Sequence, residues 1–82
     1  MEKSKLEILE ILKYELYTAI KYTALAEEKA KAGNKGGAIY FLDIAQVAYE
    51  CACKRSRKEN IKMYNTDIIY EEMERVNEII KN

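Results

Sequence analysis

The fold is decided by residues 4–37, SKLEILEILKYELYTAIKYTALAEEKAKAGNKGG, which hold one long helical pattern and the turn that ends it. Ser4 and Glu7 have the spacing of a capping box, an arrangement that satisfies free amides at the start of a helix. No glycine or proline follows until Gly33, so the pattern predicts a helix of about 29 residues, roughly 43 Å long. Apolar residues mark one face of it, namely Ile8, Leu12, Ala19, Tyr22 and Ala26, with Leu9, Leu16, Ile20 and Thr23 beside them.

A second helix is predicted after the glycine-rich bend at residues 33–37. We expect Gly33 to adopt the left-handed conformation that ends many helices, and the later glycines to allow a tight reversal. The second helix should run from about Gly37 to Glu59, antiparallel to the first. Its small, alanine-rich face comprises Phe41, Ile44, Ala45, Ala48, Cys51 and Ala52.

A third helix is indicated near the C-terminus, although two stretches could begin it. Asn65-Thr66-Asp67 is typical of a helix start, and residues 56–59 also fit a capping box. We favour a start after Asn65. The apolar stripe then consists of Ile69, Met73, Val76 and Ile80, joined by Ile68 and Ile79, with Glu71, Glu72, Glu74 and Glu78 in solvent. The prediction is an all-α fold, a long antiparallel helical hairpin plus a third helix, forming a single helical domain over residues 1–82.

The balance of charges argues against nucleic acid and membranes as partners. The chain has 14 basic and 14 acidic residues, a formal net charge of zero and a sequence pI near 6.3. No overall field would therefore attract an anionic polymer or lipid surface. The basic run from Lys54 to Lys58 is interpreted as the end of a helix, where cations complement the helix dipole.

The cysteine and histidine content limits the chemistry available. The chain has no histidine, which excludes a Ser-His-Asp or Cys-His catalytic site. Cys51 and Cys53 point about 200° apart on a helix, so they cannot bridge each other. Free thiols, no apolar leader and no apolar run near 18 residues predict a cytoplasmic protein without a membrane span.

Glu15 is the acidic residue that needs an explanation. It falls inside the apolar stripe of the first helix, where a carboxylate requires a partner, a proton or a metal ion. It could bond to a buried tyrosine hydroxyl or reach the edge of the bundle. The alternative is that Glu15 is a metal ligand.

The register from Glu15 to Ala52 resembles the rubrerythrin-like branch of the ferritin-like superfamily. The matching positions are Glu15, Tyr22, Leu25-Ala26, Gly33, Phe41, Ile44-Ala45 and Ala52. The resemblance implies half of a four-helix bundle that carries a di-iron centre. It also implies a glutamate at position 48 and a histidine at position 51, where this chain has Ala48 and Cys51.

These two changes remove most of the metal ligands that the resemblance implies. Each hairpin of a di-iron bundle supplies a Glu and a Glu-x-x-His, and this chain retains only Glu15. Glu15 and Cys51 remain as weak metal candidates, and a zinc ion shared across a dimer is the corresponding alternative. Cys51 is otherwise expected to be a small buried apolar residue. We therefore expect no cofactor, no complete metal site and no catalytic residue.

The resulting functional hypothesis is a non-catalytic oligomerisation or protein-interaction module. A long hairpin with apolar stripes on both faces exceeds what one short third helix can cover. We therefore expect a homodimer in which two hairpins pair into a four-helix bundle, each third helix lying along an edge.

Two alternatives stay open at the level of sequence. Gly33-Asn34, Ala38, Leu42 and Ala45 also resemble the turn and second helix of the microtubule-interacting and trafficking domain, a monomeric three-helix domain that binds partner helices in a groove. A residual metalloenzyme acting on iron or peroxide is the second alternative, which the changes at Ala48 and Cys51 oppose.

Overall fold

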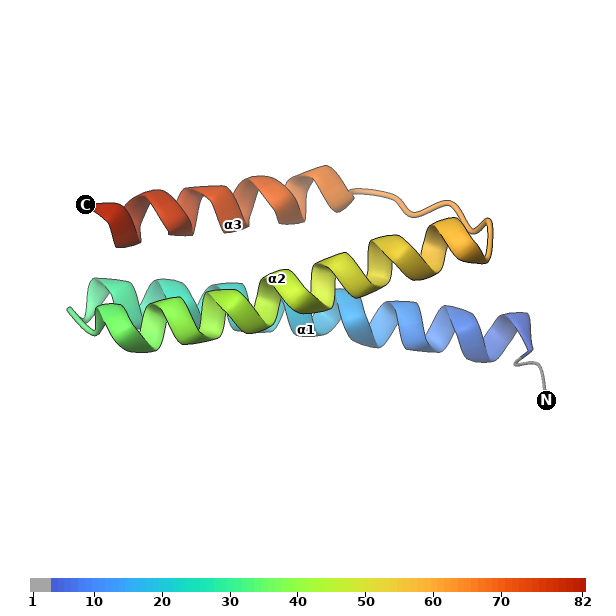
Figure 1. Ribbon diagram of the computed structural model, residues 1–82, viewed down its shortest axis with the longest axis horizontal. Helices are drawn as coiled ribbons and strands as arrows, with labels where there is room; N and C mark the ends of the chain where they lie inside the picture. The colour runs from blue at the N-terminus through green and yellow to red at the C-terminus, as the bar shows by residue number, and fades with distance from the viewer. Residues whose placement is uncertain (1–3) are drawn as a thin grey trace.

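The computed structural model describes residues 4–82 and consists of three helices in chain order, α1 (Lys5–Lys31), α2 (Lys35–Lys58) and α3 (Thr66–Lys81). Helices α1 and α2 form an antiparallel hairpin, and α3 lies along one side of it (Figure 1). No strand occurs in residues 4–82, which confirms the all-α prediction of a hairpin plus a third helix. None of these helices has a stretch long and apolar enough to cross a bilayer.

The two ends of α1 follow the predicted chemistry. At the start, the Glu7 amide donates to the Ser4 hydroxyl oxygen at 3.2 Å, and the Ser4 hydroxyl donates to Glu7 Oε1 at 3.3 Å. At the end, Gly33 has a φ of +81°, and the Asn34 amide donates to the carbonyl of Lys29 at 2.8 Å. Only a residue without a Cβ adopts this left-handed conformation without strain, so Gly33 ends the helix.

Helix α2 begins two residues earlier than predicted, at Lys35 instead of Gly37, and it ends at Lys58 instead of Glu59. The early start has a local cause, because Asn34 caps the helix: its side-chain oxygen accepts from the Gly37 amide at 2.9 Å. Gly36 and Gly37 therefore belong to the first turn of α2 and not to the reversal. The bend itself is short, comprising residues 32–34.

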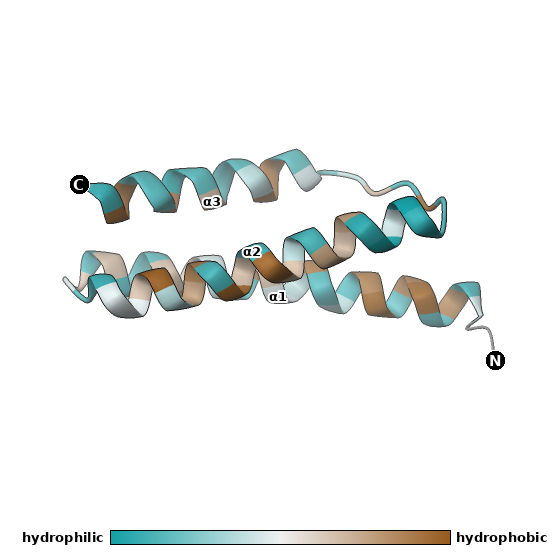
Figure 2. Cartoon of the chain, viewed as in Figure 1, coloured by the Kyte–Doolittle hydropathy of each residue, from teal (hydrophilic) through white to brown (hydrophobic). Residues whose placement is uncertain are grey.

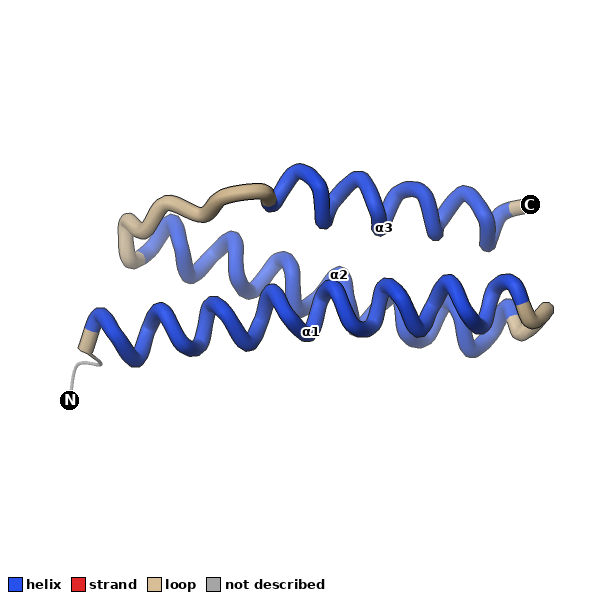
Figure 3. The backbone as a smooth tube through the Cα atoms, turned by 180° about the vertical axis from the view of Figure 1, so that it is seen from behind, coloured by secondary structure: helices blue, strands red, loops and turns tan. Residues whose placement is uncertain are grey.

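Helix α3 begins at Thr66, directly after the predicted Asn65, but the capping chemistry differs from the expectation. The Asn65 side chain makes no capping hydrogen bond, and the residue has a left-handed φ of +62°. Asparagine tolerates this conformation better than most residues do. Asn65 thus redirects the chain into α3 through its backbone, at the end of the 59–65 connection that is visible in Figure 3.

The buried residues form two clusters along the hairpin. Near the bend, α3 packs onto the hairpin and completes the larger cluster, which contains Ala26, Ala38, Leu42, Ala45, Met73, Val76 and Ile80. At the open end, the 59–65 connection covers the smaller cluster of Ile8, Leu12 and Ala52, with Leu16, Ile61 and Met63 against it. Alanines at the hairpin interface let the helices approach closely, as the sequence predicted.

The buried strip of the hairpin is rotated from the predicted one. On α1, Thr23 is buried and Tyr22 only half-buried; on α2, Leu42 is buried, whereas Phe41 and Ala48 are half-buried. The cause is the position of α3, which packs over the Leu42 side of α2. The hairpin residues on that side are therefore the ones shielded from water. The prediction that the side carrying residues 15, 22, 41 and 48 forms the interior is therefore only partly correct. On α3, Met73, Val76 and Ile80 are buried as predicted, but Ile68 is exposed.

Candidate functional site: the uncovered surfaces of the hairpin

Glu15 has a partner that the sequence analysis did not identify. Its Oε1 atom accepts a hydrogen bond from Arg55 Nε at 2.9 Å, which joins α1 to the last turn of α2. The Glu15 side chain is only 14% exposed, so the guanidinium supplies the compensation that a carboxylate at this depth needs. The same hydrogen bond raises the pKa of Arg55 above its ordinary value. Of the partners that the sequence left open for Glu15, none was an arginine; the observed partner comes from the basic run at residues 54–58.

Cys51 is exposed, which corrects the expectation that it is a small buried residue. Cys53 is half-buried, and both thiols are free. Helical phase explains the error, because Cys51 lies on the outer side of α2 once Leu42 and Ala52 mark its interior. Within residues 4–82, no three Cys, Asp or Glu side chains come together in a group that could hold a metal ion.

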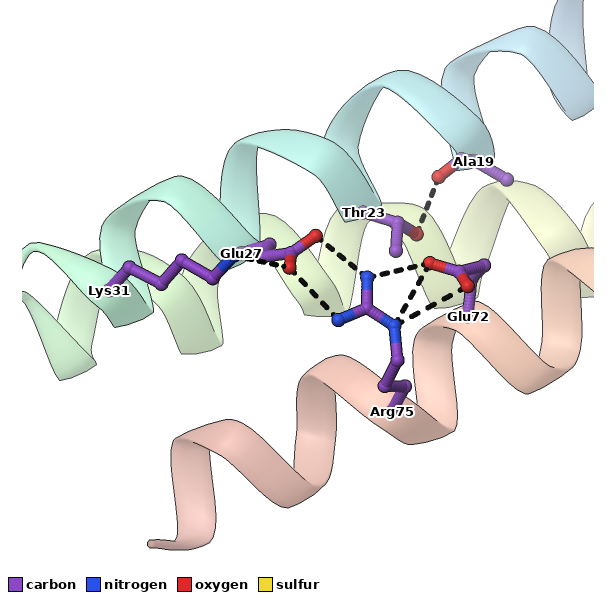
Figure 4. A network of polar contacts seen from close by, with 6 residues as sticks. All are labelled: Ala19, Thr23, Glu27, Lys31, Glu72 and Arg75. Atoms are coloured by element: carbon purple, nitrogen blue, oxygen red, sulfur yellow. Dashed lines mark hydrogen bonds and ion pairs between the residues drawn. The ribbon is translucent and has the colours of Figure 1, made fainter.

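A cluster of charges fastens α3 to α1 (Figure 4). Arg75 donates to both oxygens of Glu27, at 2.8 and 2.9 Å, and to Glu72 at 2.8 Å. Lys31 approaches Glu27 from the other side at 3.0 Å. These partners, above all the hydrogen bonds from Arg75, lower the pKa of Glu27 to about 2. The cluster is a structural clamp, because its charges neutralise one another.

A groove runs between α1 and α3 beside this clamp. Its volume is about 280 Å³, and apolar side chains from both helices form most of its wall. Glu27 and Glu72 lie at its polar edge. The lining residues are Ile20, Thr23, Ala24, Glu27, Ile68, Ile69 and Glu72. Sequence reasoning placed Ile20 and Ile68 beside the core stripes, and it did not predict that the two would share an open groove.

The opposite side of the hairpin has no covering element in residues 4–82. Figures 1 and 3 show α3 along one side of the hairpin and no helix or loop along the other. At about 100° of helical rotation per residue, Tyr14 points roughly 140–180° away from Thr23 and Glu27, which face α3, and Tyr22 points roughly 100–140° away from them. We name this surface the free face and define it by Tyr14, Tyr22, Tyr40, Phe41, Ile44 and Val47.

The free face is apolar and aromatic. Tyr14, Tyr40 and Val47 are 70%, 63% and 60% exposed. The rings of Tyr22 and Phe41 lie 5.7 Å apart, and those of Tyr40 and Phe41 lie 5.5 Å apart, so these three aromatic side chains form one group. Tyr22, Phe41 and Ala48 are half-buried, and all three belong to or border this face.

No protein-family model, curated protein or solved structure matches this chain.

Proposed function

We propose that this protein is a non-catalytic helical interaction module that binds a second copy of itself. The observation that carries the proposal is the number of large apolar side chains that α3 leaves exposed on the hairpin. Exposed apolar surface is costly in water, and large continuous patches of it are typical of protein interfaces. A small chain also gains stability when association buries the surface that its own core cannot cover.

The extent of α3 supports this proposal. Helix α3 has 16 residues and α1 has 27, so α3 covers only the bend half of the hairpin. Figure 2 shows hydrophobic bands on the part of α1 that extends beyond α3, while most residues of α3 are coloured as hydrophilic. Most of the large apolar side chains exposed in residues 4–82 lie on α1 and α2, which supports association through the hairpin.

The resemblance to the rubrerythrin-like branch agrees with the same proposal. Ferritin-like bundles contain four long helices, and the hairpin here supplies two. A second copy would supply the other two and leave each α3 outside the four-helix core. Glu15 would retain its Arg55 partner in such a dimer, so the pairing requires no metal.

Sedimentation equilibrium of the reduced protein between 1 and 100 µM tests the proposal, with native mass spectrometry as a second readout. We expect a reversible monomer–dimer equilibrium within this range. A monomer at every concentration would contradict self-association.

A monomeric peptide-binding domain is the second candidate function, and the open groove between α1 and α3 favours it. Such a groove is suited to the apolar face of an amphipathic helix, as in the domain that residues 33–45 resemble. A synthetic leucine–lysine amphipathic helix, titrated into the protein, is the probe. Saturable binding that Ala24→Glu abolishes and Lys21→Glu preserves, by a chain that sediments as a monomer, would support this candidate over self-association.

A further inference from the structure

We infer that the second copy docks on the free face in one orientation, with α1 of each chain over α2 of its partner and the two-fold axis parallel to the helices. This inference rests on the proposed self-association. It specifies which surface associates and how the two copies are aligned. Both are inferred from charged side chains at the border of the free face.

Each helix of the hairpin carries an acidic and a basic residue at the border of the free face. On α1 these are Glu10 and Lys21, and on α2 they are Asp43 and Lys54, in both cases about three turns of helix apart. Glu10 lies beside Tyr14 in a shallow hollow of the surface, and the Lys21 ammonium lies 5.9 Å from the Tyr22 ring. Asp43 and Lys54 flank Val47, one turn before it and two turns after it.

The antiparallel hairpin places these four charges at the corners of a rectangle with alternating signs. Leu12 and Ala52 share one buried cluster, and Ala26 and Ala38 share the other, which sets the relative levels of the two helices approximately. Glu10 precedes Leu12 by as many residues as Lys54 follows Ala52, so Glu10 and Lys54 lie at about the same level. Lys21 and Asp43 lie level for the same reason, relative to Ala26 and Ala38.

A two-fold axis parallel to the helices preserves these levels while it places α1 of one chain over α2 of the other. Glu10 then meets the Lys54 side chain of the second copy, and Lys21 meets its Asp43. Glu7 and Lys58 are also nearly level, which adds a third pair of opposite charges. The alternative is a two-fold axis perpendicular to the helices. It places Glu10 of one copy against Lys21 of the other, and Asp43 against Lys54, only when the two copies are shifted along the helix direction. Glu7 and Lys58 then have no partner of opposite charge.

The same charges favour a second copy over other occupants. Two acids and two lysines of alternating sign give the border no net charge, so neither a polyanion nor a strongly basic peptide matches it. None of the ion pairs found within residues 4–82 involves these four side chains. They are thus available to a partner with the same alternating pattern, which a copy of this chain provides.

Charge reversal tests the orientation, with the dimer dissociation constant measured by sedimentation equilibrium under reducing conditions, because Cys51 borders the free face. We expect Glu10→Lys and Lys54→Glu each to weaken the dimer about tenfold, since every reversal acts twice in a two-fold dimer. The double variant Glu10→Lys/Lys54→Glu should return to within about threefold of the wild-type constant, because both contacts are restored with opposite sign.

Glu10→Lys/Lys21→Glu is the matched control, with the same charge composition as the rescuing variant. It should remain weak, because it places like charges against Lys54 and Asp43 of the second copy. Rescue by this control in place of the other double variant would overturn the inferred orientation. A wild-type dimer that is unaffected by any of these reversals would show that another surface associates, and the inference would be wrong while the proposed function stands. A monomeric wild type would refute both.

Discussion

Gly36 and Gly37 are adjacent and belong to the same helical turn, yet they have different structural roles. A Cβ at Gly37 would lie 2.8 Å from Nδ2 of Asn34, the side chain that caps α2. A Cβ at Gly36 would meet nothing within 4 Å. Gly37 therefore makes room for the cap, whereas Gly36 only adds flexibility to the unfolded chain.

Alanine substitutions should separate these two roles. Gly36→Ala is expected to raise the free energy of unfolding by about 0.5–1 kcal/mol, because alanine has the better helix propensity. Gly37→Ala gains the same propensity but displaces the Asn34 cap, a loss of about 1 kcal/mol, so its net effect should be near zero or destabilising. Urea denaturation measures both. Equal stabilisation by the two substitutions would contradict the capping role of Asn34.

The Glu15–Arg55 pair makes a second prediction at the scale of the residue. Arg55→Met leaves a carboxylate of low exposure without a partner, so we expect the melting temperature to fall by several degrees. Arg57→Met, which changes an exposed residue in the same turn, is the control and should have little effect. The double variant Glu15→Leu/Arg55→Met should recover most of the loss. Thermal unfolding followed by circular dichroism gives the comparison.

At the scale of the element, α3 is held by three buried apolar side chains and by the Arg75 clamp. The Arg75 clamp makes the attachment of α3 to α1 dependent on pH. The pKa of Glu27 is lowered from 4.5 to about 2 in the folded protein, so the unfolded chain binds a proton more readily. The contribution of Glu27 to stability is therefore complete above pH 4.5 and is lost as the pH falls toward 2.

Glu27→Gln should remove this dependence. We expect the variant to melt a few degrees below the wild type at pH 7, with the difference shrinking between pH 4.5 and 2. Glu28→Gln, a neighbouring exposed carboxylate outside the clamp, should behave as the wild type. Melting curves across this pH range provide the measurement. A difference that stays constant with pH would show that the charge of Glu27 is not what fastens α3.

At the scale of the whole molecule, stability should depend on concentration if the chain associates. A dimer that dissociates on unfolding gives a melting temperature that rises with protein concentration. Val47→Lys on the free face should suppress this rise without lowering the melting temperature of the dilute protein, since Val47 is already 60% exposed. Tyr64→Lys, at a position that is 74% exposed on the 59–65 connection, is the control and should retain the rise. Calorimetry at 5 and 200 µM distinguishes the two variants.

The sequence by itself determined the helices, because their ends depend on local chemistry. Ser4 caps α1 by bonding within its own first turn, and Gly33 ends that helix through its own backbone conformation. The start of α3 directly after Asn65 was predicted from the same kind of local signal. Asn65 acts there through its left-handed backbone conformation and not through a side-chain cap. Helix type and length thus follow from interactions between residues a few positions apart, which the order of the sequence displays directly.

Only the tertiary structure decided which faces are buried and which charges pair. The apolar residues of α1 and α2 extend around more than one face, so the position of α3 selects Thr23 and Leu42 over Tyr22 and Phe41. Glu15 pairs with Arg55, and Glu27 pairs with Arg75. The partners are far apart in the sequence, and the periodicity of a helix does not predict such pairs. A helix presents side chains in every direction, and the packing of its neighbours determines which of them lose contact with water and which remain free to bind a partner.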